Sequence, residues 1–261
     1  MQPDGHAAAA LWVVIPAFNE ERWLEPTLAA LAKQREAGRF TVLVVDNAST
    51  DSTAAVVEAA MGRHPELDLR LLLETEKGTG SACDTGFRHA IEHGAQFVLR
   101  TDADSLPDRG WVAAMRHALE AESLDLVGGR ILPRTDDGTS PRGALAISAL
   151  IAWCMRCLGR FNPVNRGPEF RCAYTLVPGF NLGVRAAAYL DAGGFPRSRI
   201  DDVHEDWEFT NRVRRISNRV EYRRCALVRY SNRRVARHGM VAVLRWYVTH
   251  GGKVATQIDV R

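Results

Sequence analysis

Residues 99–105 read Leu-Arg-Thr-Asp-Ala-Asp-Ser, and the rest of the chain is interpreted from this stretch. The apolar run at 97–99 predicts a buried strand that ends just before Asp102 and Asp104. Open α/β sheets bind ligands at the carboxyl ends of their strands. Two carboxylates one residue apart there form half of a site for Mg²⁺ or Mn²⁺, which phosphate and water complete. The alternative is that Asp104 caps the next helix and Asp102 lies in a loop.

The first half of the chain alternates short apolar runs with helical patterns. We expect strands over residues 11–15, 40–45, 67–73, 96–100 and 124–128, and helices over 20–35, 53–63, 82–93 and 108–120. Strands that alternate with helices of this length predict parallel βαβ units with right-handed crossovers. The fold class is therefore α/β, with a Rossmann-like, mainly parallel twisted sheet flanked by helices.

The pattern changes after Arg130. A polar loop (133–142) leads to an apolar helix (143–158) and an irregular stretch (160–177). A strand (181–184), a helix (185–192), a Gly193-Gly194 turn and a helix (205–216) follow. Two short β-runs around Val220 and Leu227 precede a basic amphipathic helix (240–248). We expect residues 1–10 to be a flexible tail without the features of a secretory signal.

Composition limits the classes of protein. The 261 residues are 46% hydrophobic and 25% charged, as in a globular protein of one large or two small domains. Net charge is only +3, but residues 205–238 carry ten arginines and four acids. Such a basic face suits a phosphate-bearing ligand, nucleic acid or an anionic membrane; a solvated surface is the alternative. The longest apolar stretch, 143–155, is shorter than the roughly 18–20 residues of a membrane span. Of the five cysteines, Cys154 and Cys157 have CxxC spacing; they indicate buried helical thiols in a reducing cytosol, with redox or metal chemistry as the alternative.

Each of the first three predicted strands ends in polar or glycine-rich residues. The three loops begin Pro16-Ala17, Asp46-Asn47 and Lys77-Gly78. Carboxylates and amides read base edges and ribose hydroxyls, and a glycine-rich turn with Lys77 lets backbone N–H groups approach phosphate. Ordinary turn and capping chemistry is the alternative. Neither a P-loop nor a GxGxxG motif is present, so the loops do not indicate a dinucleotide site.

A second acidic group occupies residues 201–208, where five of eight residues are Asp or Glu. One of these acids could act as a general base, and Trp207 offers a face for stacking on a sugar. Acids favoured by the dipole at a helix N-terminus are the alternative.

Six segments, in this order and at these intervals, resemble family 2 glycosyltransferases of the GT-A fold. They are VVIPAFNEE, VVDNASTDST, ETEKGTGSACDTGFRHA, TDADS, PGFNLGVRAAAYLDAGGF and HEDWEFTNRV. The resemblance covers about residues 11–216. It implies a nucleotide-diphosphate sugar donor of UDP or GDP type, a divalent metal (Mn²⁺ or Mg²⁺) and inversion at the anomeric carbon. It also implies one continuous domain with a nucleotide-sugar half (11–130) and an acceptor and catalytic-base half (131–261).

The resemblance also implies roles for individual residues. The nucleotide-sugar pocket would be formed by Pro16, Ala17, Glu20, Asp46, Asn47, Lys77, Gly78, Asp102, Ala103 and Asp104. Asp46 or Asn47 would contact the base; many relatives have a second Asp where this chain has Asn47. Asp102 and Asp104 would be the DxD pair that holds the metal.

On the acceptor side, Asp206 matches the acid of the family's ED motif, the usual catalytic base, with Glu205 beside it. Asn181 falls in the acceptor-side GxN segment, and Trp207 would also face the acceptor. We assign Arg233, Arg234 and His238 to the diphosphate.

The chain departs from the processive members of that family, which carry a QxxRW motif and membrane spans. Residues 242–246 read AVLRW, without the Gln. We therefore predict a hexosyltransferase-like enzyme that transfers a single sugar to an acceptor hydroxyl. Two other classes stay open: a sugar-phosphate nucleotidyltransferase, which would need a glycine-rich basic loop after the first strand, and a non-catalytic carbohydrate-binding protein.

The sequence does not name the acceptor, which we expect to be a glycan or a lipid-linked compound and not a nucleic acid. The helices at 143–158 and 240–248 suit contact with a membrane surface. A core helix or a homodimer contact is the alternative for the first of them. We expect a cytoplasmic protein, with peripheral contact at the inner face of the membrane if the acceptor is lipid-linked.

Overall fold

The computed structural model describes residues 10–139, 159–197 and 205–238. The predicted tail and the predicted helices at 143–158 and 240–248 lie outside these ranges, apart from residue 10. So do Asp201 and Asp202 and the side chains of Arg234 and His238.

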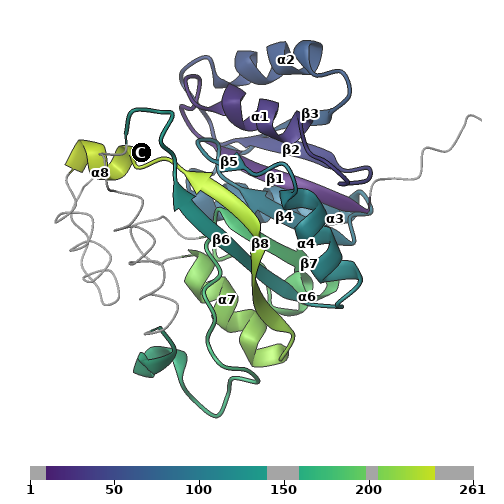
Figure 1. Ribbon diagram of the computed structural model, residues 1–261, viewed down its shortest axis with the longest axis vertical. Coiled ribbons are helices and arrows are strands. Elements are labelled where there is room, and N and C mark those ends of the chain that lie inside the picture. Colours follow the sequence, from purple (N-terminus) through teal and green to yellow (C-terminus); the bar gives the residue numbers. More distant parts are fainter. Residues whose placement is uncertain (1–9, 140–158, 198–204, 239–261) are drawn as a thin grey trace, which may run out of the picture.

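The described chain forms one eight-stranded sheet with the order β3-β2-β1-β4-β7-β6-β8-β5 (Figure 1). The strands are β1 (Leu11–Ala17), β2 (Thr41–Asp46), β3 (Asp68–Leu73), β4 (Phe97–Thr101), β5 (Leu106–Pro107), β6 (Leu126–Pro133), β7 (Asn181–Arg185) and β8 (Val220–Tyr230). Neighbours from β3 to β4 pair in parallel, β7 is antiparallel to both β4 and β6, and β8 is parallel to β6. The predicted mainly parallel α/β fold is confirmed.

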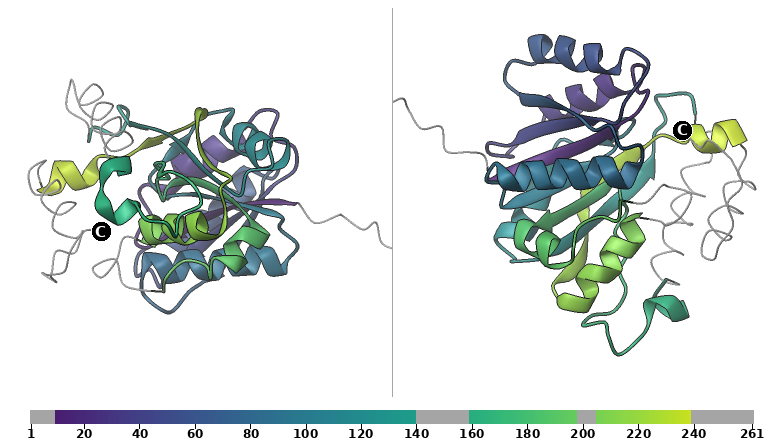
Figure 2. Two further views of the ribbon diagram at one scale, coloured as in Figure 1. Left: turned by 90° about the horizontal axis from the view of Figure 1, so that it is seen from below. Right: turned by 180° about the vertical axis from the view of Figure 1, so that it is seen from behind.

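Helices cover both faces of the sheet. They are α1 (Leu24–Ala32), α2 (Thr53–Arg63), α3 (Thr79–Glu92), α4 (Trp111–Glu120), α6 (Ala186–Asp191), α7 (Glu205–Ile216) and α8 (Arg233–His238), with 3₁₀ helices η1 (Gly159–Phe161) and η2 (Pro163–Asn165). In Figure 1, α4 lies in front of the sheet. In the right-hand view of Figure 2, seen from behind, α3 lies in front of the opposite face.

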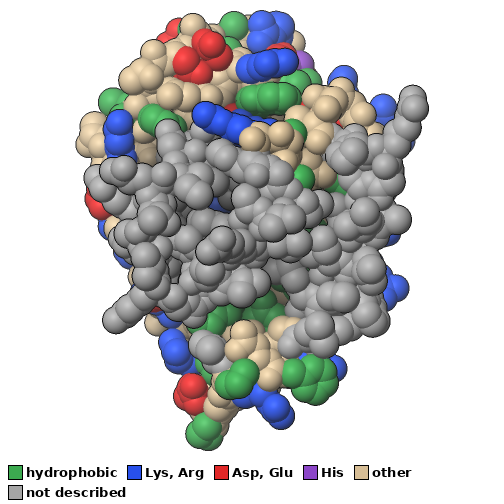
Figure 3. All heavy atoms as spheres, turned by 90° about the vertical axis from the view of Figure 1, so that its left-hand side faces the viewer, with side chains coloured by type: hydrophobic (Ala, Val, Ile, Leu, Met, Phe, Trp, Pro, Cys, Tyr) green, Lys and Arg blue, Asp and Glu red, His purple; other side chains and the backbone are tan. Residues whose placement is uncertain are grey.

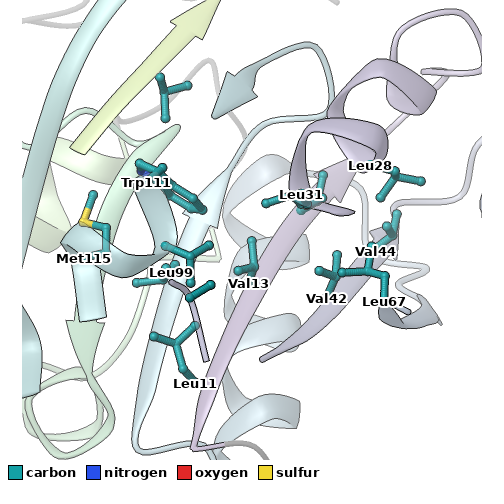
Figure 4. Close-up of a cluster of buried hydrophobic side chains, with 14 of the residues drawn as sticks. Leu11, Val13, Leu28, Leu31, Val42, Val44, Leu67, Leu99, Trp111 and Met115 are labelled. Carbon is teal, nitrogen blue, oxygen red and sulfur yellow. The ribbon is translucent and has the colours of Figure 1, made fainter. Parts of the chain in front are cut away.

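Alternation along β1 explains the two hydrophobic cores. Leu11 and Val13 face α1, α2 and α4, in the cluster drawn in Figure 4. Trp12 and Val14 face the opposite way and pack with α3, α6 and α7. Successive residues of a strand point to opposite faces, so a strand covered on both faces has an unbroken apolar sequence.

Several boundaries differ from the predicted ones. Helix α1 begins at Leu24, because residues 21–23 form a turn, and α3 begins at Thr79, three residues before the predicted start. Gly86 allows α3 its close approach to the sheet, since a Cβ there would lie 2.6 Å from Val14. Helices α2 and α7 have their predicted bounds.

The second half of the sheet shows the larger corrections. The two β-runs predicted around Val220 and Leu227 form one strand, β8. Gly129 pairs with Arg223 and Arg130 with Leu227, so residues 224–226 bulge out of the ladder and break the alternation. Strand β6 continues to Pro133, beyond its predicted end at 128, because β8 pairs with it throughout. The short strand β5 was not predicted.

Candidate active site

The loops after β1, β2 and β3 are joined at the carboxyl edge of the sheet. The N–H of Asn47 donates to the carbonyl of Ala17 (2.8 Å), and the N–H of Glu74 donates to the carbonyl of Asp46 (2.8 Å). Three of the predicted donor-site loops therefore lie side by side, as expected for the ligand-binding edge of an α/β sheet.

Asn47 fixes the shape of two of these loops. Its side-chain Nδ2 donates to the carbonyls of Glu74 (3.2 Å) and Glu76 (2.7 Å), and its Oδ1 accepts from the N–H of Gly78 (2.8 Å). The side chain is buried, and its hydrogen bonds hold Gly78 at a φ of 147°. These contacts give Asn47 a loop-shaping role, and contact of Asp46 or Asn47 with the base stays a prediction.

The remaining residues of this edge differ in exposure. Asp46 is buried, and its Oδ1 accepts from the N–H of Ser49 (3.0 Å). Lys77 is exposed, with its Nζ 5.5 Å from the centre of the Phe18 ring. Ala17 is buried and Pro16 is half-buried at the end of β1. Lys77 thus offers an exposed cation beside loops that are held by hydrogen bonds.

The Asp102-Ala103-Asp104 turn directly follows β4. The Ala103 side chain is buried, whereas the side chains of Asp102 and Asp104 are 34% and 15% exposed. Thr27 of α1 supports the turn, because its hydroxyl lies 2.7 Å from the carbonyls of both Ala103 and Ser105. From another side, Arg134 Nη1 donates to the carbonyl of Asp104 (3.0 Å).

Arg233 connects this turn to the loop after β1. Its Nε lies 2.8 Å from Asp104 Oδ2, and its Nη1 donates to Glu20 Oε2 (2.7 Å). Glu20 is buried away from water, and the guanidinium of Arg233 compensates the charge of its carboxylate. The predicted residues Glu20, Asp104 and Arg233 are therefore in direct contact, although 213 positions separate Glu20 from Arg233 in sequence.

Arg100 makes the second link, from the same turn to α7. This buried residue of β4 donates from Nη2 to Asp102 Oδ1 (3.3 Å) and to Glu205 Oε1 (3.2 Å). Burial raises the pKa of Glu205, and the Arg100 charge offsets part of that rise. Arg100 was not predicted as a site residue; the signal was a charged residue inside an apolar strand.

Asp206 lies in the first turn of α7, next to Glu205. Its Oδ2 accepts from the N–H of Gly179 (2.9 Å), and its Oδ1 accepts from the N–H of Trp207 (2.7 Å). A Cβ on Gly179 would lie 3.0 Å from Asp206 Cβ and 3.3 Å from Arg100 Nη1. Glycine at this position therefore lets the 179–181 segment approach both Asp206 and Arg100.

Asn181, from that same segment, belongs to the interior. Its side chain is fully buried: Oδ1 accepts from Trp111 Nε1 (2.8 Å), and Nδ2 donates to the carbonyls of Arg130 (2.8 Å) and Ala226 (3.0 Å). In this structure Asn181 joins β7, β6, β8 and α4, and its acceptor-side role stays a prediction.

Trp207 and Tyr174 are further neighbours of Asp206. Trp207 Nε1 donates to Oδ1 of the buried Asn165 (2.7 Å). Burial, together with the nearby Asp206 charge, raises the pKa of Tyr174 to about 12. The sequence carried no signal for Asn165 or Tyr174, because their segment is irregular.

The metal prediction depends on Asp102 and Asp104. Among the described residues, no cluster of three or more His, Cys, Asp and Glu side chains could hold a metal ion. Two partly exposed carboxylates on one turn fit a hard divalent cation that takes its other ligands from phosphate and water. In the same described part, no helix is long and apolar enough to span a membrane.

Comparison with known proteins gives concordant results. A family model described as Glycosyl transferase family 2 matches residues 12–181. Glycosyltransferase AglE of Haloferax volcanii is 26% identical over 196 residues, 74% of this chain and 58% of that protein. Undecaprenyl-phosphate mannosyltransferase of Micrococcus luteus is 31% identical over 121 residues, 46% of this chain and 48% of that protein.

Two solved structures resemble the fold. Mannosyltransferase PcManGT from Pyrobaculum calidifontis, in complex with GDP-Man and Mn²⁺, has a TM-score of 0.66 and 25% identity, over 92% of this chain and 61% of that one. S. aureus TarS 1-349 in complex with UDP-GlcNAc has a TM-score of 0.61 and 21% identity, over 85% of this chain and 58% of that one. The chain thus spans only 48% to 61% of the length of these four proteins.

Proposed function

The chain belongs to glycosyl transferase family 2 and has its GT-A fold, and from this premise we propose that it transfers a single sugar from a nucleotide-diphosphate sugar to an acceptor hydroxyl, with inversion and with a divalent metal. The observation that carries the proposal is the Arg100 bridge. It joins Asp102, at the predicted donor site, to Glu205, the neighbour of the predicted base Asp206.

Asp102 and Asp104 would hold the metal, which when bound neutralises charge on the departing nucleoside diphosphate. The Mn²⁺ and GDP-Man in the PcManGT structure support this choice of ligand class. The donor's base stays open, since TarS has been solved with UDP-GlcNAc. The contact of Arg233 with Asp104 supports its predicted role beside the diphosphate.

Asp206 would take the proton of the acceptor hydroxyl as the oxygen attacks the anomeric carbon. The bond from that carbon to the diphosphate oxygen breaks on the opposite face, which inverts the configuration. Two backbone N–H groups orient the Asp206 carboxylate, and each oxygen keeps a lone pair for the incoming proton. A positioned carboxylate of this kind contributes to proton transfer in the transition state.

The acceptor stays open between a glycan and a lipid-linked compound. The name of the Micrococcus luteus relative favours the lipid-linked class and, with it, peripheral membrane contact. Partition of the protein between buffer and anionic vesicles tests that contact. A cytoplasmic location, a homodimer and the absence of a nucleic-acid partner remain predictions.

The proposal is tested by thermal unfolding in the presence of UDP- and GDP-sugars with Mn²⁺. Ligands that bind the native state raise its unfolding temperature. We expect at least one nucleotide sugar to stabilise the protein, and EDTA to remove most of the effect. Asp104→Asn should lose the metal-dependent part, whereas the matched change Asp108→Asn, outside the turn, should keep it. Absence of stabilisation by every nucleotide sugar would contradict the proposal.

A further inference from the structure

A cavity of about 480 Å³ lies beside α7, between that helix and the segment that carries η1 and η2. Its volume falls in the range of small-molecule sites. Cationic and aromatic side chains dominate its lining: Arg160, Arg166, Arg171, Arg214, Phe170 and Tyr174. At the lower end of Figure 3, hydrophobic and basic side chains lie next to each other on the surface of this part of the molecule.

Arg214 is a buried cation without a carboxylate partner in the described part of the chain. Its Nη1 donates to Asn211 Oδ1 (2.6 Å), and its Nη2 donates to the carbonyls of Asn165 (3.0 Å) and Cys172 (2.9 Å). Its Nε is buried and, among the described residues, has no hydrogen-bond partner. Neutral oxygens thus orient this guanidinium and leave its charge uncompensated, a costly state for a buried ion.

Aromatic rings hold the same guanidinium flat. The Arg214 Cζ lies 4.2 Å from the ring centre of Phe170 and 5.5 Å from that of Tyr174. Stacking fixes the plane of the guanidinium. Because Nη1 and Nη2 already donate to protein oxygens and Nε is buried, Arg214 gives the cavity positive charge, and direct contacts to an oxyanion fall to the exposed arginines. Burial lowers the pKa of Arg214, and a bound anion would reverse that effect.

The other lining arginines add to this positive charge. Arg160, Arg166 and Arg171 are exposed, and no ion pair links them to a described carboxylate. The nearest acid on this segment is Glu169, which is exposed and lies against Gly167, so that a Cβ there would be 2.0 Å from its Oε2. Even with Glu169 counted, the four arginines leave the cavity positive.

The cavity adjoins the predicted catalytic base. Asn165 lines the cavity and accepts the Trp207 Nε1 hydrogen bond, and Trp207 follows Asp206 directly. Tyr174 also lines the cavity, close enough to Asp206 for the carboxylate charge to raise its pKa. The cavity is therefore linked to Asp206 through Asn165, Trp207 and Tyr174.

We propose that this cavity binds a phosphomonoester group of the acceptor and so presents the acceptor hydroxyl to Asp206; the inference rests on the function proposed above. Phosphate suits the site because guanidinium groups bind its oxygens bidentately. The aromatic lining suits an apolar body next to the phosphate. Two sources share this chemistry: a soluble sugar phosphate, or a lipid that carries both a phosphomonoester and a free hydroxyl.

Phenyl phosphate is a suitable probe, since it combines an aromatic ring with a phosphomonoester. Its dissociation constant is measured by calorimetry in EDTA, so that no metal at Asp102 and Asp104 contributes. The variant is Arg166→Gln with Arg171→Gln; both side chains are exposed, so folding does not depend on them. The matched control is Arg224→Gln, which removes an exposed arginine of β8 that does not line the cavity.

We expect the double variant to weaken phenyl phosphate binding by about tenfold or more, as for lost charge-assisted hydrogen bonds, and the control to change it less than about twofold. Equal binding by the double variant and the wild type, or no binding by the wild type, overturns the inference. Failure of the proposed donor function shows separately, as absence of stabilisation by nucleotide sugars in the wild-type protein.

Two further arms identify the source of the phosphate. Glucose 6-phosphate represents a soluble sugar phosphate, and lysophosphatidic acid in detergent, which carries a free hydroxyl beside its phosphomonoester, represents a lipid. Binding of either one that depends on Arg166 and Arg171 supports the cavity and names its class. If both bind as well to the double variant as to the wild type, the inference fails.

Discussion

Two groups of arginines, Arg100 with Arg233 and Arg214 with the exposed arginines of the cavity, differ in what neutralises their charge. Arg100 is paired with the carboxylates of Asp102 and Glu205. Arg233 is paired with those of Glu20 and Asp104. Arg214 has only amide and carbonyl oxygens as partners among the described residues. The first group links loops of the predicted donor site before any ligand arrives. The second group gains its counter-charge from a ligand.

The largest expected effect comes from Asp206→Asn, which leaves both arginine groups intact. Removing a general base lowers sugar transfer by about 10²- to 10⁴-fold, while stabilisation by the donor persists. Transfer is measured as metal-dependent hydrolysis of the nucleotide-sugar donor. Glu208→Gln, an acid-to-amide change on the same helix, is the control and should stay near wild type. Near-normal turnover of the Asp206 variant would show that another group is the general base.

The next largest effect is on the free energy of unfolding, which should fall further when Arg100 is replaced than when Arg214 is replaced. Arg100→Met leaves Glu205 buried and unpaired, which costs about 3–5 kcal/mol of unfolding free energy. Arg214→Met strands no carboxylate and should cost less, about 1–3 kcal/mol for lost hydrogen bonds. Urea unfolding measures both. Adding Glu205→Gln to Arg100→Met should restore part of the lost unfolding free energy. A larger loss for Arg214→Met than for Arg100→Met would contradict the expected difference between the two groups.

Arg233→Gln probes the paired group from the donor side. We expect affinity for the nucleoside diphosphate with Mn²⁺ to fall by about tenfold, since a charge-assisted contact to phosphate is lost. Titration calorimetry with UDP and GDP measures the change. Arg237→Gln, an exposed arginine on the same helix, is the control. An unchanged affinity would limit Arg233 to neutralising Glu20 and Asp104.

The smallest effect is a pH dependence. Burial raises the pKa of Glu205 above its usual 4.5, so the folded state holds this proton more tightly than the unfolded state. Between the two pKa values the contribution of Glu205 to stability falls as pH rises, by at most about 1.4 kcal/mol per pH unit. Glu205→Gln should flatten the unfolding free energy above pH 4.5, as measured by urea unfolding across pH. A steeper decline in the variant would contradict the sign.

The loops at the carboxyl edge of the sheet were predictable because strand ends follow local rules. Buried parallel strands are continuous apolar runs, so the residues after them, such as Asp46 and Asp102, are identified from sequence. What the local pattern could not give is a partner distant in sequence. Arg100 contacts Glu205, which is 105 positions away in sequence. The side-chain amide of Asn47 forms hydrogen bonds with the loop around Gly78.

The acceptor side was less predictable for the same reason. Strand β8 contains a bulge that breaks its alternation, and β7 inserts antiparallel between β4 and β6. The cavity draws Asn165 and Tyr174 from an irregular segment and Arg214 from a helix. Asn181 has the spacing of an acceptor residue, yet the sheet packs around it. Only the tertiary arrangement identifies such residues.

The most direct test of the central claim is the configuration of the sugar released by donor hydrolysis, recorded by proton NMR before the anomers equilibrate. A base at Asp206 opposite the leaving diphosphate activates a water molecule in place of the acceptor hydroxyl. From an α-linked nucleotide sugar we predict the β-anomer as the first product, absent in Asp206→Asn. Initial release of the α-anomer would contradict an inverting transfer with Asp206 as its base.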